Sequence, residues 1–323
     1  MWSSEIALGA EQGIAGNAFA ASRSHGLGLC EARRSSDMRI GNVLELWRYP
    51  VKSMRGERLE VCRVEQRVGI PGDRSWAVRD ALAGEIRGAK KIPRLLELTA
   101  RTLGEPVGEA VPSVEIELPD GRAVTSEDPN VSDRISQALG RDVTLEARRP
   151  ATELDHYRRA RRIDDIDGEI REASELLPEE EVPEFEEFAA ELLEFVSPPG
   201  TYFDGFEFHV LTDASMLELS RSAPGSQIDT RRFRPNLVVE TTGSGSGFPE
   251  FEWCGRQLQI GGLRLQVVSP MLRCGMTIHA QADLAKEPAI MRALVRETDM
   301  TLGVGAAVVT AGEVRLGDPI ELL

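Results

Sequence analysis

The fold is most constrained by a series of short β-type segments that are separated by glycine, proline and aspartate turns and run over residues 38–323. The alternating segment Arg39–Tyr49 opens the series, and Leu258–Val268 has the pattern of a hairpin around a Gly-Gly pair. Two further strand-like segments, 303–310 and 314–322, close the chain around an Ala-Gly turn. Many strands with few helices favour a barrel.

Three helices are predicted among these strands, and the shortest runs through Met216 and Leu219 with Thr212 or Asp213 as its cap. Val131, Ile135 and Leu139 recur at helical spacing and are followed by Gly140, and a second helix is expected over 288–296. The 323 residues leave room for two domains. We therefore predict an α+β, mostly β fold with these parts: a disordered extension at 1–37, an N-terminal β-rich domain at 38–150, an acidic, partly helical insertion at 151–199, and a C-terminal β-barrel with peripheral helices at 200–323.

The first 37 residues are rich in Gly, Ala and Ser and show no sustained apolar period, which is the basis for predicting disorder there. The weakly apolar stretch 13–22 follows acidic rather than basic residues, so it does not resemble a signal peptide. No stretch approaches the roughly 18 uncharged apolar residues of a membrane helix. We predict a cytoplasmic protein without a membrane partner.

Negative charge is concentrated in one segment. Residues Asp164–Glu194 hold 14 acidic side chains and one basic one, so they carry −13 of the total charge of −15. The rest of the chain is near −2 and is free to bind anions elsewhere, although we expect no nucleic-acid partner. The segment is either an arm that binds or electrostatically steers a partner or, in the favoured interpretation, a solvated insertion.

Cys274 is the most interesting candidate for chemistry. It follows Arg273 in a strand-like setting before Gly275, where a nearby guanidinium would favour the thiolate. A buried, inert cysteine is the alternative. His279, five residues on, would lie on the opposite face of a regular strand and should not meet the thiol. The other cysteines, at 30, 62 and 254, have no zinc-type spacing, and the chain has no phosphate-binding P-loop motif.

Cations and hydroxyls follow several of the predicted strands and turns. Lys52 and Ser53 come after one strand, Arg74 follows a Gly-Asp turn, and Arg234 and Asn236 flank a proline. Such groups at strand ends suit recognition of an anion such as phosphate. Together with a thiolate candidate they suggest a phosphorylated, metal-bearing cofactor.

Five motifs that carry these residues occur in a fixed order: Tyr49-Pro-Val-Lys-Ser53, Gly72-Asp-Arg-Ser-Trp76, Arg232-Phe-Arg-Pro-Asn236, Met271-Leu-Arg-Cys274, and Leu302-Gly-Val with Gly312-x-Val-x-x-Gly-Asp318. This set resembles the MOSC proteins that have an N-terminal MOSC β-barrel domain. More narrowly, it resembles the relatives of the mitochondrial amidoxime-reducing component.

The resemblance implies a pterin-bound molybdenum cofactor between the two domains, with Cys274 as catalytic residue and metal ligand. It implies two-electron reduction of small N-oxygenated substrates, with electrons from a separate ferredoxin, flavoprotein or cytochrome-type protein. Pyridoxal phosphate binding is also associated with such families. The implied cofactor-binding residues are Lys52, Ser53, Arg74, Thr212, Ser215, Arg234, Asn236 and Arg273.

Two alternatives stay open. The protein could be a non-catalytic carrier of molybdenum cofactor or persulfide sulfur on Cys274, or, less favoured, a cysteine hydrolase that lacks a local base. One departure from many relatives bears on the substrate, because Gly275-Met-Thr-Ile-His-Ala280 follows the cysteine where they have Thr-Val-Asp-Pro.

Overall fold

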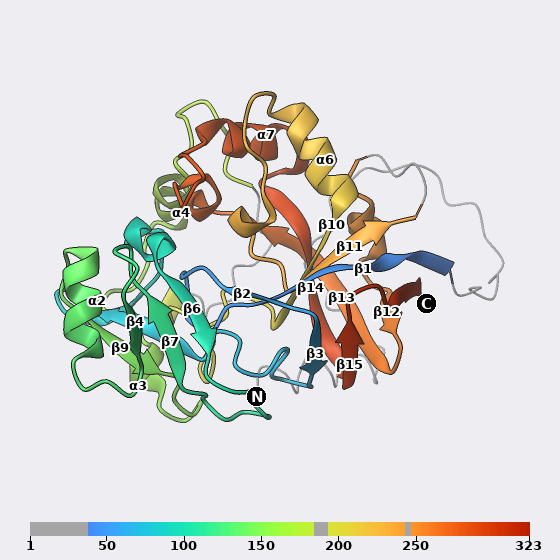
Figure 1. The fold of residues 1–323 in the computed structure, drawn as a ribbon. Helices are drawn as coiled ribbons and strands as arrows, with labels where there is room; N and C mark the ends of the chain where they lie inside the picture. Colours follow the sequence, from blue (N-terminus) through green and yellow to red (C-terminus); the bar gives the residue numbers. More distant parts are fainter. Residues whose placement is uncertain (1–37, 184–192, 243–246) are drawn as a thin grey trace.

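The computed structural model describes residues 38–183, 193–242 and 247–323. The extension predicted at 1–37 lies outside these residues, so its predicted disorder is not addressed by the structure. Figure 1 shows a barrel that carries helices on one side and a smaller strand-rich domain beside it. The predicted class, α+β and mostly β, is confirmed.

Seven strands close into a barrel because the first and last members of their order are also paired. Leu46, Val210 and Val304 are fully buried in its apolar core, as expected for a small barrel filled by side chains. In ring order the strands are β1 (Met38–Arg48), β11 (Leu237–Thr241), β10 (Phe208–Thr212), β14 (Thr301–Thr310), β13 (Leu263–Leu272), β12 (Gln257–Ile260) and β16 (Pro319–Leu322), with β2 (Glu57–Leu59) paired to the outside of β1.

Strand β1 differs from the sequence interpretation, which placed it in the N-terminal domain. It pairs antiparallel with β11, where Val43 lies opposite Val239, and with β16, where Asn42 lies opposite Pro319. The barrel therefore contains strands from both ends of the chain. The alternating apolar residues of β1 suit a strand in either domain. Because β11 and β16 are so distant in the sequence, no local pattern indicates that β1 pairs with them.

The N-terminal domain contains two three-stranded sheets. One is β5 (Glu85–Arg87), β4 (Trp76–Asp80) and β9 (Val143–Ala147), and the other is β6 (Thr99–Thr102), β7 (Val114–Glu117) and β8 (Ala123–Thr125). The 3-10 helix η1 (Pro93–Glu97) and the helix α2 (Val131–Leu139) complete this domain. The prediction for α2 is confirmed, because Val131, Ile135 and Leu139 are its buried residues and Gly140 ends it with φ 66°.

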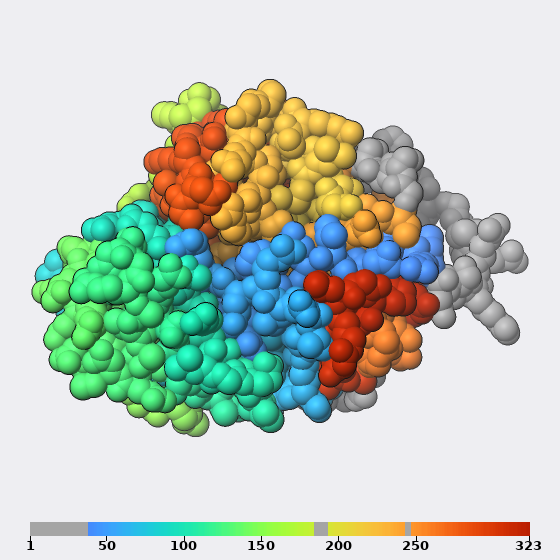
Figure 2. Space-filling model, viewed as in Figure 1, coloured from blue at the N-terminus to red at the C-terminus, as the bar shows by residue number. Residues whose placement is uncertain are grey.

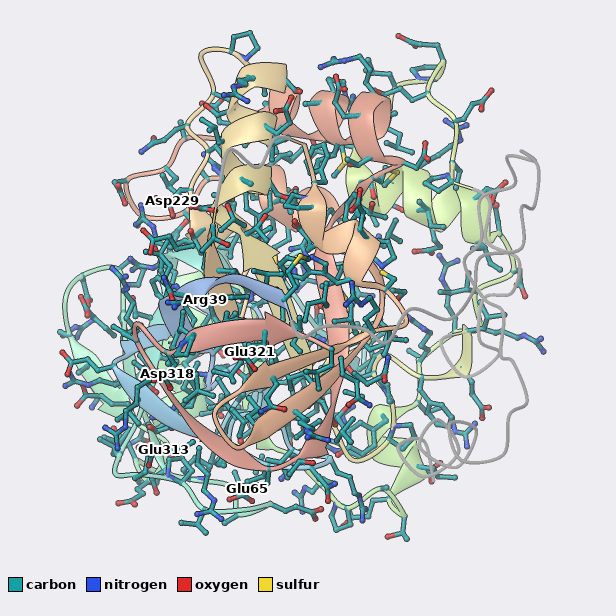
Figure 3. The ribbon with its side chains drawn as sticks, turned by 90° about the vertical axis from the view of Figure 1, so that its right-hand side faces the viewer. Arg39, Glu65, Asp229, Glu313, Asp318 and Glu321 are labelled. Carbon is teal, nitrogen blue, oxygen red and sulfur yellow. The ribbon has the colours of Figure 1, made fainter. Side chains whose placement is uncertain are left out.

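Against the barrel, β3 (Val61–Val64) pairs with β15 (Gly312–Arg315), and Cys62, Val64 and Val314 of this pair belong to the barrel core. Val314 of β15 is buried whereas Glu313 is exposed, which gives the alternation of a half-buried strand. Glu313 and Asp318 lie on the face shown in Figure 3. In the space-filling view the two domains are in direct contact (Figure 2).

Most of the remaining helices in the described part of the chain lie around the barrel and the domain junction. They are α6 (Asp213–Ser222), α7 (Pro288–Thr298), the 3-10 helices η2 (Thr230–Arg232), η3 (Pro249–Trp253) and η4 (Gly275–Ile278), and, in the insertion, α3 (Leu154–Tyr157) and α4 (Ile166–Ser174). The helix predicted near 288–296 is confirmed as α7. Among the described residues, no helix is long and apolar enough to cross a membrane.

The strand setting predicted for Cys274 is wrong. Strand β13 ends at Leu272, and Cys274 is the residue before η4. The backbone N–H and the hydroxyl of Thr277 both donate to the Cys274 carbonyl oxygen at 3.0 Å, which turns the chain into a 3-10 helix. The argument that separated Cys274 from His279 by strand faces therefore does not apply.

Candidate functional site

Cys274 lies where the two domains meet. Its half-buried side chain packs with Ala89 and Leu96 of the N-terminal domain and with Met276 of η4. A thiol on this boundary is next to groups contributed by both domains. This agrees with the location that the sequence resemblance implied for a cofactor.

Ser53 holds the turn that contacts Cys274. Its hydroxyl oxygen accepts a hydrogen bond from the backbone N–H of Ala89 at 2.9 Å. Close packing reinforces this contact, since a β-carbon at Gly88 would lie 2.7 Å from that same hydroxyl oxygen. Ser53 thus positions residues 88–89 against the cysteine loop.

Four buried or nearly buried cations, Lys52, Arg74, Arg234 and Arg273, form what we call the cationic cluster. Tyr49 lies at its centre, with the guanidinium carbon of Arg234 at 4.1 Å and that of Arg74 at 4.9 Å from its ring centroid. Both distances suit cation–π attraction. Arg234 also donates to the Met54 carbonyl oxygen, which ties residues of the two domains together.

Asp73 and Asn236 fix the geometry beneath these cations. Asp73 is buried, pairs with Arg74, and accepts from the backbone N–H of Tyr49 at 2.7 Å and from Nδ2 of Asn236 at 2.9 Å. The side-chain oxygen Oδ1 of Asn236 in turn accepts from the His209 backbone N–H at 3.1 Å. Asn236 therefore links the turn that carries Arg74 to strand β10 of the barrel.

Lys52 is held by the loop that enters the barrel. Its ammonium donates to the Tyr202 carbonyl oxygen at 2.8 Å and to the Asp204 carboxylate at 2.6 Å. Burial lowers the pKa of Lys52, and the attraction of Asp204 partly offsets this. Burial alone would raise the pKa of Asp204, but Lys52, Lys90 and Arg74 together outweigh it and hold that pKa well below its ordinary value. Asp204 is nevertheless exposed, with 68% of its side chain accessible.

Arg273 precedes Cys274 and is only 6% exposed. Its Nη2 donates to the Phe233 carbonyl oxygen at 2.6 Å, whereas its buried Nε has no hydrogen-bond acceptor among the described residues. Burial lowers the pKa of Arg273, and burial together with Arg74 lowers the pKa of Arg234 to about 10. Burying these cations therefore costs folding free energy, since their charges are incompletely compensated.

The charges of the cluster do not cancel. The four cations face two carboxylates, Asp73 and Asp204, of which the second is exposed. An excess of buried positive charge with an unused guanidinium N–H suits an anion with several oxygen acceptors, such as a phosphate ester. The residues present therefore fit the phosphate of a pterin cofactor, with the Cys274 thiol as a soft metal ligand beside them.

Three residues of the site have left-handed backbone conformations. The φ angles are 66° at Ser53, 45° at Arg74 and 55° at Arg234. Residues other than glycine rarely adopt this region, and such strain concentrates at functional sites where the surroundings enforce it. All three residues were singled out from the sequence for their chemistry alone.

Thr212 and Ser215 belong to a different cluster. Thr212 Oγ1 donates to Oε2 of the buried Glu250 at 2.7 Å, and Ser215 Oγ lies 2.6 Å from that same oxygen. Thr212 also accepts from the backbone N–H of Ser215, which confirms the predicted cap of α6. We call these three residues the Glu250 cluster. Both hydroxyl groups that were predicted to hold a cofactor are engaged by Glu250.

Sequence reasoning missed several residues that shape the site. Tyr49, Asp73 and Arg232 stand within the quoted motifs but were given no role, whereas Asp204 and Glu250 lie outside them. The missed roles depend on partners far away in the sequence. For Tyr49 and Asp73, the available signal was their position near the cations Lys52 and Arg74 in the same motifs.

Arg232 supports the loop that follows Cys274. It is 1% exposed and donates only to carbonyl oxygens, those of Gln227, Thr277, His279 and Ala285, at 2.8–3.4 Å. A guanidinium is well suited to this role because its N–H groups form a planar fork. Arg232 thereby fixes η4 and the turn after it.

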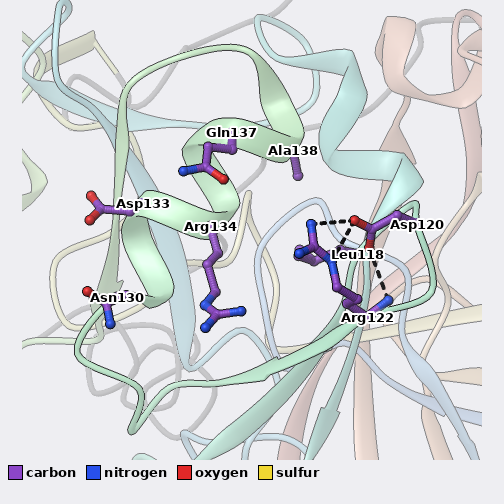
Figure 4. Close-up of a pocket in the computed structure, with 8 residues that line it drawn as sticks. All are labelled: Leu118, Asp120, Arg122, Asn130, Asp133, Arg134, Gln137 and Ala138. Carbon is purple, nitrogen blue, oxygen red and sulfur yellow. Dashed lines mark hydrogen bonds and ion pairs between the residues drawn. The ribbon is translucent and has the colours of Figure 1, made fainter.

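A hollow of about 430 Å³ lies elsewhere, in the N-terminal domain between α2 and the β7–β8 hairpin (Figure 4). Arg122, which lines it, is paired with Asp120 of the same hairpin. None of the predicted site residues lines this hollow. Among the described residues, no three His, Cys, Asp or Glu side chains are grouped as a metal site would need, and Cys62, Cys254 and Cys274 are free thiols.

Two protein-family models match the chain, one in each half. Residues 40–154 match the MOSC N-terminal beta barrel domain, and residues 200–321 match the MOSC domain. The chain is therefore a MOSC domain protein, a class associated with molybdenum cofactor binding. Neither match distinguishes the amidoxime-reducing relatives from other members, and no finding supports pyridoxal phosphate binding.

Similar solved structures are distant. The YuaD protein from Bacillus subtilis is 13% identical, with 89% of this chain and 98% of that chain covered and a TM-score of 0.35. YiiM from Geobacillus stearothermophilus is 18% identical over 36% of this chain and 54% of that chain, with a TM-score of 0.29. A search of curated proteins yields no significant match.

Proposed function

We propose that the protein is a molybdenum-cofactor oxidoreductase that reduces small N-oxygenated compounds with electrons from a separate protein. The observation that carries the proposal is the position of Cys274 at the domain junction beside a cationic cluster with surplus positive charge. When bound, the cofactor supplies two-electron chemistry that protein side chains lack. A ferredoxin, flavoprotein or cytochrome-type donor and a cytoplasmic location are parts of this proposal.

Each residue of the site has its own role in this proposal. Arg74, Arg234 and Arg273 would bind the phosphate of the cofactor, because bidentate guanidinium groups match its oxygens. Lys52 would add a point charge, and Ser53 would hold the turn at 88–89 in place. Cys274 would provide a soft thiolate ligand for molybdenum. Thr212 and Ser215 have no part in this scheme, since Glu250 already engages them.

The test is metal content combined with turnover. Protein from a host that makes the cofactor should contain stoichiometric molybdenum and should reduce an N-hydroxylated amidine with an artificial electron donor. Cys274→Ser replaces the soft donor with an alcohol that stays protonated, so reduction should be lost while the fold is kept. Cys62→Ser and Cys254→Ser are matched controls that should retain both properties.

Each result has a definite meaning. Wild-type rates in Cys274→Ser with full molybdenum would refute the ligand assignment. Molybdenum without turnover in the wild type would favour the carrier over the enzyme. A wild type without molybdenum, from a host shown to load another molybdenum protein, would exclude the proposed function.

A further inference from the structure

The acidic insertion covers the loop that carries Cys274. Helix α4 begins at Ile166, is capped by the Asp165 carboxylate, and ends at Ser174. Figure 1 shows α4 between α7 and the N-terminal domain. Ile170 and Ser174 are its buried residues, and Ile170 packs in the same apolar cluster as Ile278 of η4. This part of the insertion is therefore docked on the protein and is not merely solvated.

Gly275 of the cysteine loop lies directly against the backbone of α4. A β-carbon at residue 275 would lie 2.6 Å from the carbonyl oxygen of Ala173 in α4 and 3.7 Å from the Cα of Ser174. A separation of 2.6 Å from a backbone oxygen is too short for any side chain, so only glycine allows α4 to lie here.

Ion pairs fasten α4 on both sides of the junction. Glu172 pairs with Lys91 of the N-terminal domain at 2.6 Å, and Glu175 pairs with Lys286 at 2.8 Å. Arg292 of α7 also donates to the Glu175 carbonyl oxygen at 2.9 Å. Lys91 is in the same turn as Ala89, which packs on Cys274. The Glu172–Lys91 pair thus draws this turn, the helix and the cysteine loop together.

The ion pairs and apolar contacts that hold α4 are weak enough to break reversibly. In the Lys91–Glu172 pair the two side chains are 34% and 66% exposed, and exposed pairs are worth little and weaken further in salt. Ile170 is the one apolar side chain of α4 that is buried, and Ile166 is partly buried against the same cluster. Beyond the helix, Leu176 and Val182 also pack there, and Glu180 pairs with Arg292. A helix with few buried apolar contacts and exposed pairs has the properties of a segment that opens locally.

We propose that α4 is a releasable strap that controls which molecules reach the Cys274 thiol. Docked, it holds the turn at 88–91, whose Ala89 packs on the thiol, against the cysteine loop; released, it lets this turn move off the thiol. This inference goes beyond the proposed function, because it concerns access to Cys274 whether or not a metal is bound there. It also gives the acidic insertion a role at the site.

The test is the alkylation rate of Cys274 by iodoacetamide in the full-length protein produced without cofactor, followed by peptide mass spectrometry. The reagent is neutral, so salt changes its rate through the protein and not through attraction to the cationic cluster. Gly275→Ala should dislodge α4 and raise the rate at least about tenfold. Gly262→Ala is the matched control, because nothing lies within 4 Å of its β-carbon position and it should react like the wild type.

A second variant keeps the test decisive if Gly275→Ala fails to fold. Glu172→Gln removes one fastening and should raise the rate roughly two- to fivefold, as expected for loss of an exposed ion pair. Glu218→Gln, which breaks an exposed pair on α6, is its control. Raising the salt should speed alkylation in the wild type more than in Glu172→Gln.

Three outcomes would overturn the strap. They are an unchanged Cys274 rate in a folded Gly275→Ala protein, an unchanged rate in Glu172→Gln, and an equal acceleration at Cys254 and Cys62, which would indicate general loosening. None of them depends on molybdenum content, so the strap and the proposed function can fail separately.

Discussion

The cationic cluster and the Glu250 cluster both contain residues that sequence reasoning assigned to cofactor binding, yet the charge that each leaves uncompensated has the opposite sign. In the Glu250 cluster, both hydroxyl groups are engaged by one carboxylate oxygen. In the cationic cluster, the buried Nε of Arg273 has no acceptor among the described residues, and four cations face two carboxylates. Among the described residues, each cluster therefore keeps one buried polar atom without a partner. In the first it is Oε1 of the Glu250 carboxyl group, which a proton can satisfy, and in the second it is a guanidinium N–H within an excess of positive charge, which suits an anion.

The comparison shows that residue type and position at a strand end are not enough to identify a ligand site. What decides is which charge the protein leaves uncompensated. A buried charge without a full partner is costly, so its retention points to something that compensates it. A hydroxyl that already caps a helix and binds a carboxylate needs no such explanation.

The largest expected effect is on anion binding by the cationic cluster. Arg234→Met should weaken binding of inorganic pyrophosphate to the cofactor-free protein by roughly 10- to 100-fold, which is the usual value of a charge-assisted hydrogen bond. Arg234→Lys, which keeps the charge and loses the planar fork, should fall between. Isothermal titration calorimetry measures both variants, with Arg122→Met in the outer hairpin as control. Equal affinity in all four proteins would remove the distinction between the clusters.

Asp204 gives a second test, with the opposite sign. Its exposed carboxylate offsets part of the positive charge, so Asp204→Asn should strengthen pyrophosphate binding by about tenfold through reduced repulsion. Asp120→Asn, which removes a carboxylate paired with Arg122 in the β7–β8 hairpin, should have no effect. Weaker binding in Asp204→Asn would mean that the carboxylate is needed to orient Lys52.

The sequence predicted most of the elements that depend on local signals. The spacing of Val131, Ile135 and Leu139, the Gly-Gly hairpin between β12 and β13, and Pro288 at the start of α7 are all found in the structure. These features arise from periodicity and turn chemistry within a few residues. Local patterns could not place β1 in the barrel, since its partners are about 200 or more residues away.

The candidate site was likewise predicted where local motifs carry it and missed where it depends on distant contacts. Lys52, Ser53, Arg74, Arg234 and Cys274 are gathered at the domain junction as the motifs suggested. Tyr49 as the common neighbour of two guanidinium groups, and Asp204 as the partner of Lys52, depend on tertiary packing. So does the helix over Gly275, because a charged stretch shows no sign of what it will cover.

The Glu250 cluster predicts a dependence of stability on pH. Burial raises the pKa of Glu250 above its unfolded value, although the two hydroxyl groups lower it in part. The folded state therefore holds the proton more tightly, and this stability is present below the unfolded pKa of about 4.3 and is lost as the pH rises through the folded pKa. Glu250→Gln cannot lose a proton, so its stability relative to the wild type should increase from pH 4.5 to pH 8, by about 1.4 kcal/mol for each unit of pKa elevation. Urea denaturation at several pH values measures this, and a constant difference would contradict it.

The smallest effect is expected for Ser215→Ala, which separates the two clusters most directly. The change removes one hydrogen bond to Glu250 and leaves the one from Thr212, so the free energy of unfolding should fall by about 1 kcal/mol. Ser220→Ala, at an exposed position of the same helix, is the control and should be neutral or slightly stabilising. Pyrophosphate affinity should stay within about twofold of the wild type in both variants. A tenfold loss of affinity in Ser215→Ala alone would show that the Glu250 cluster contributes to anion binding, so the two clusters would have to be treated as one site.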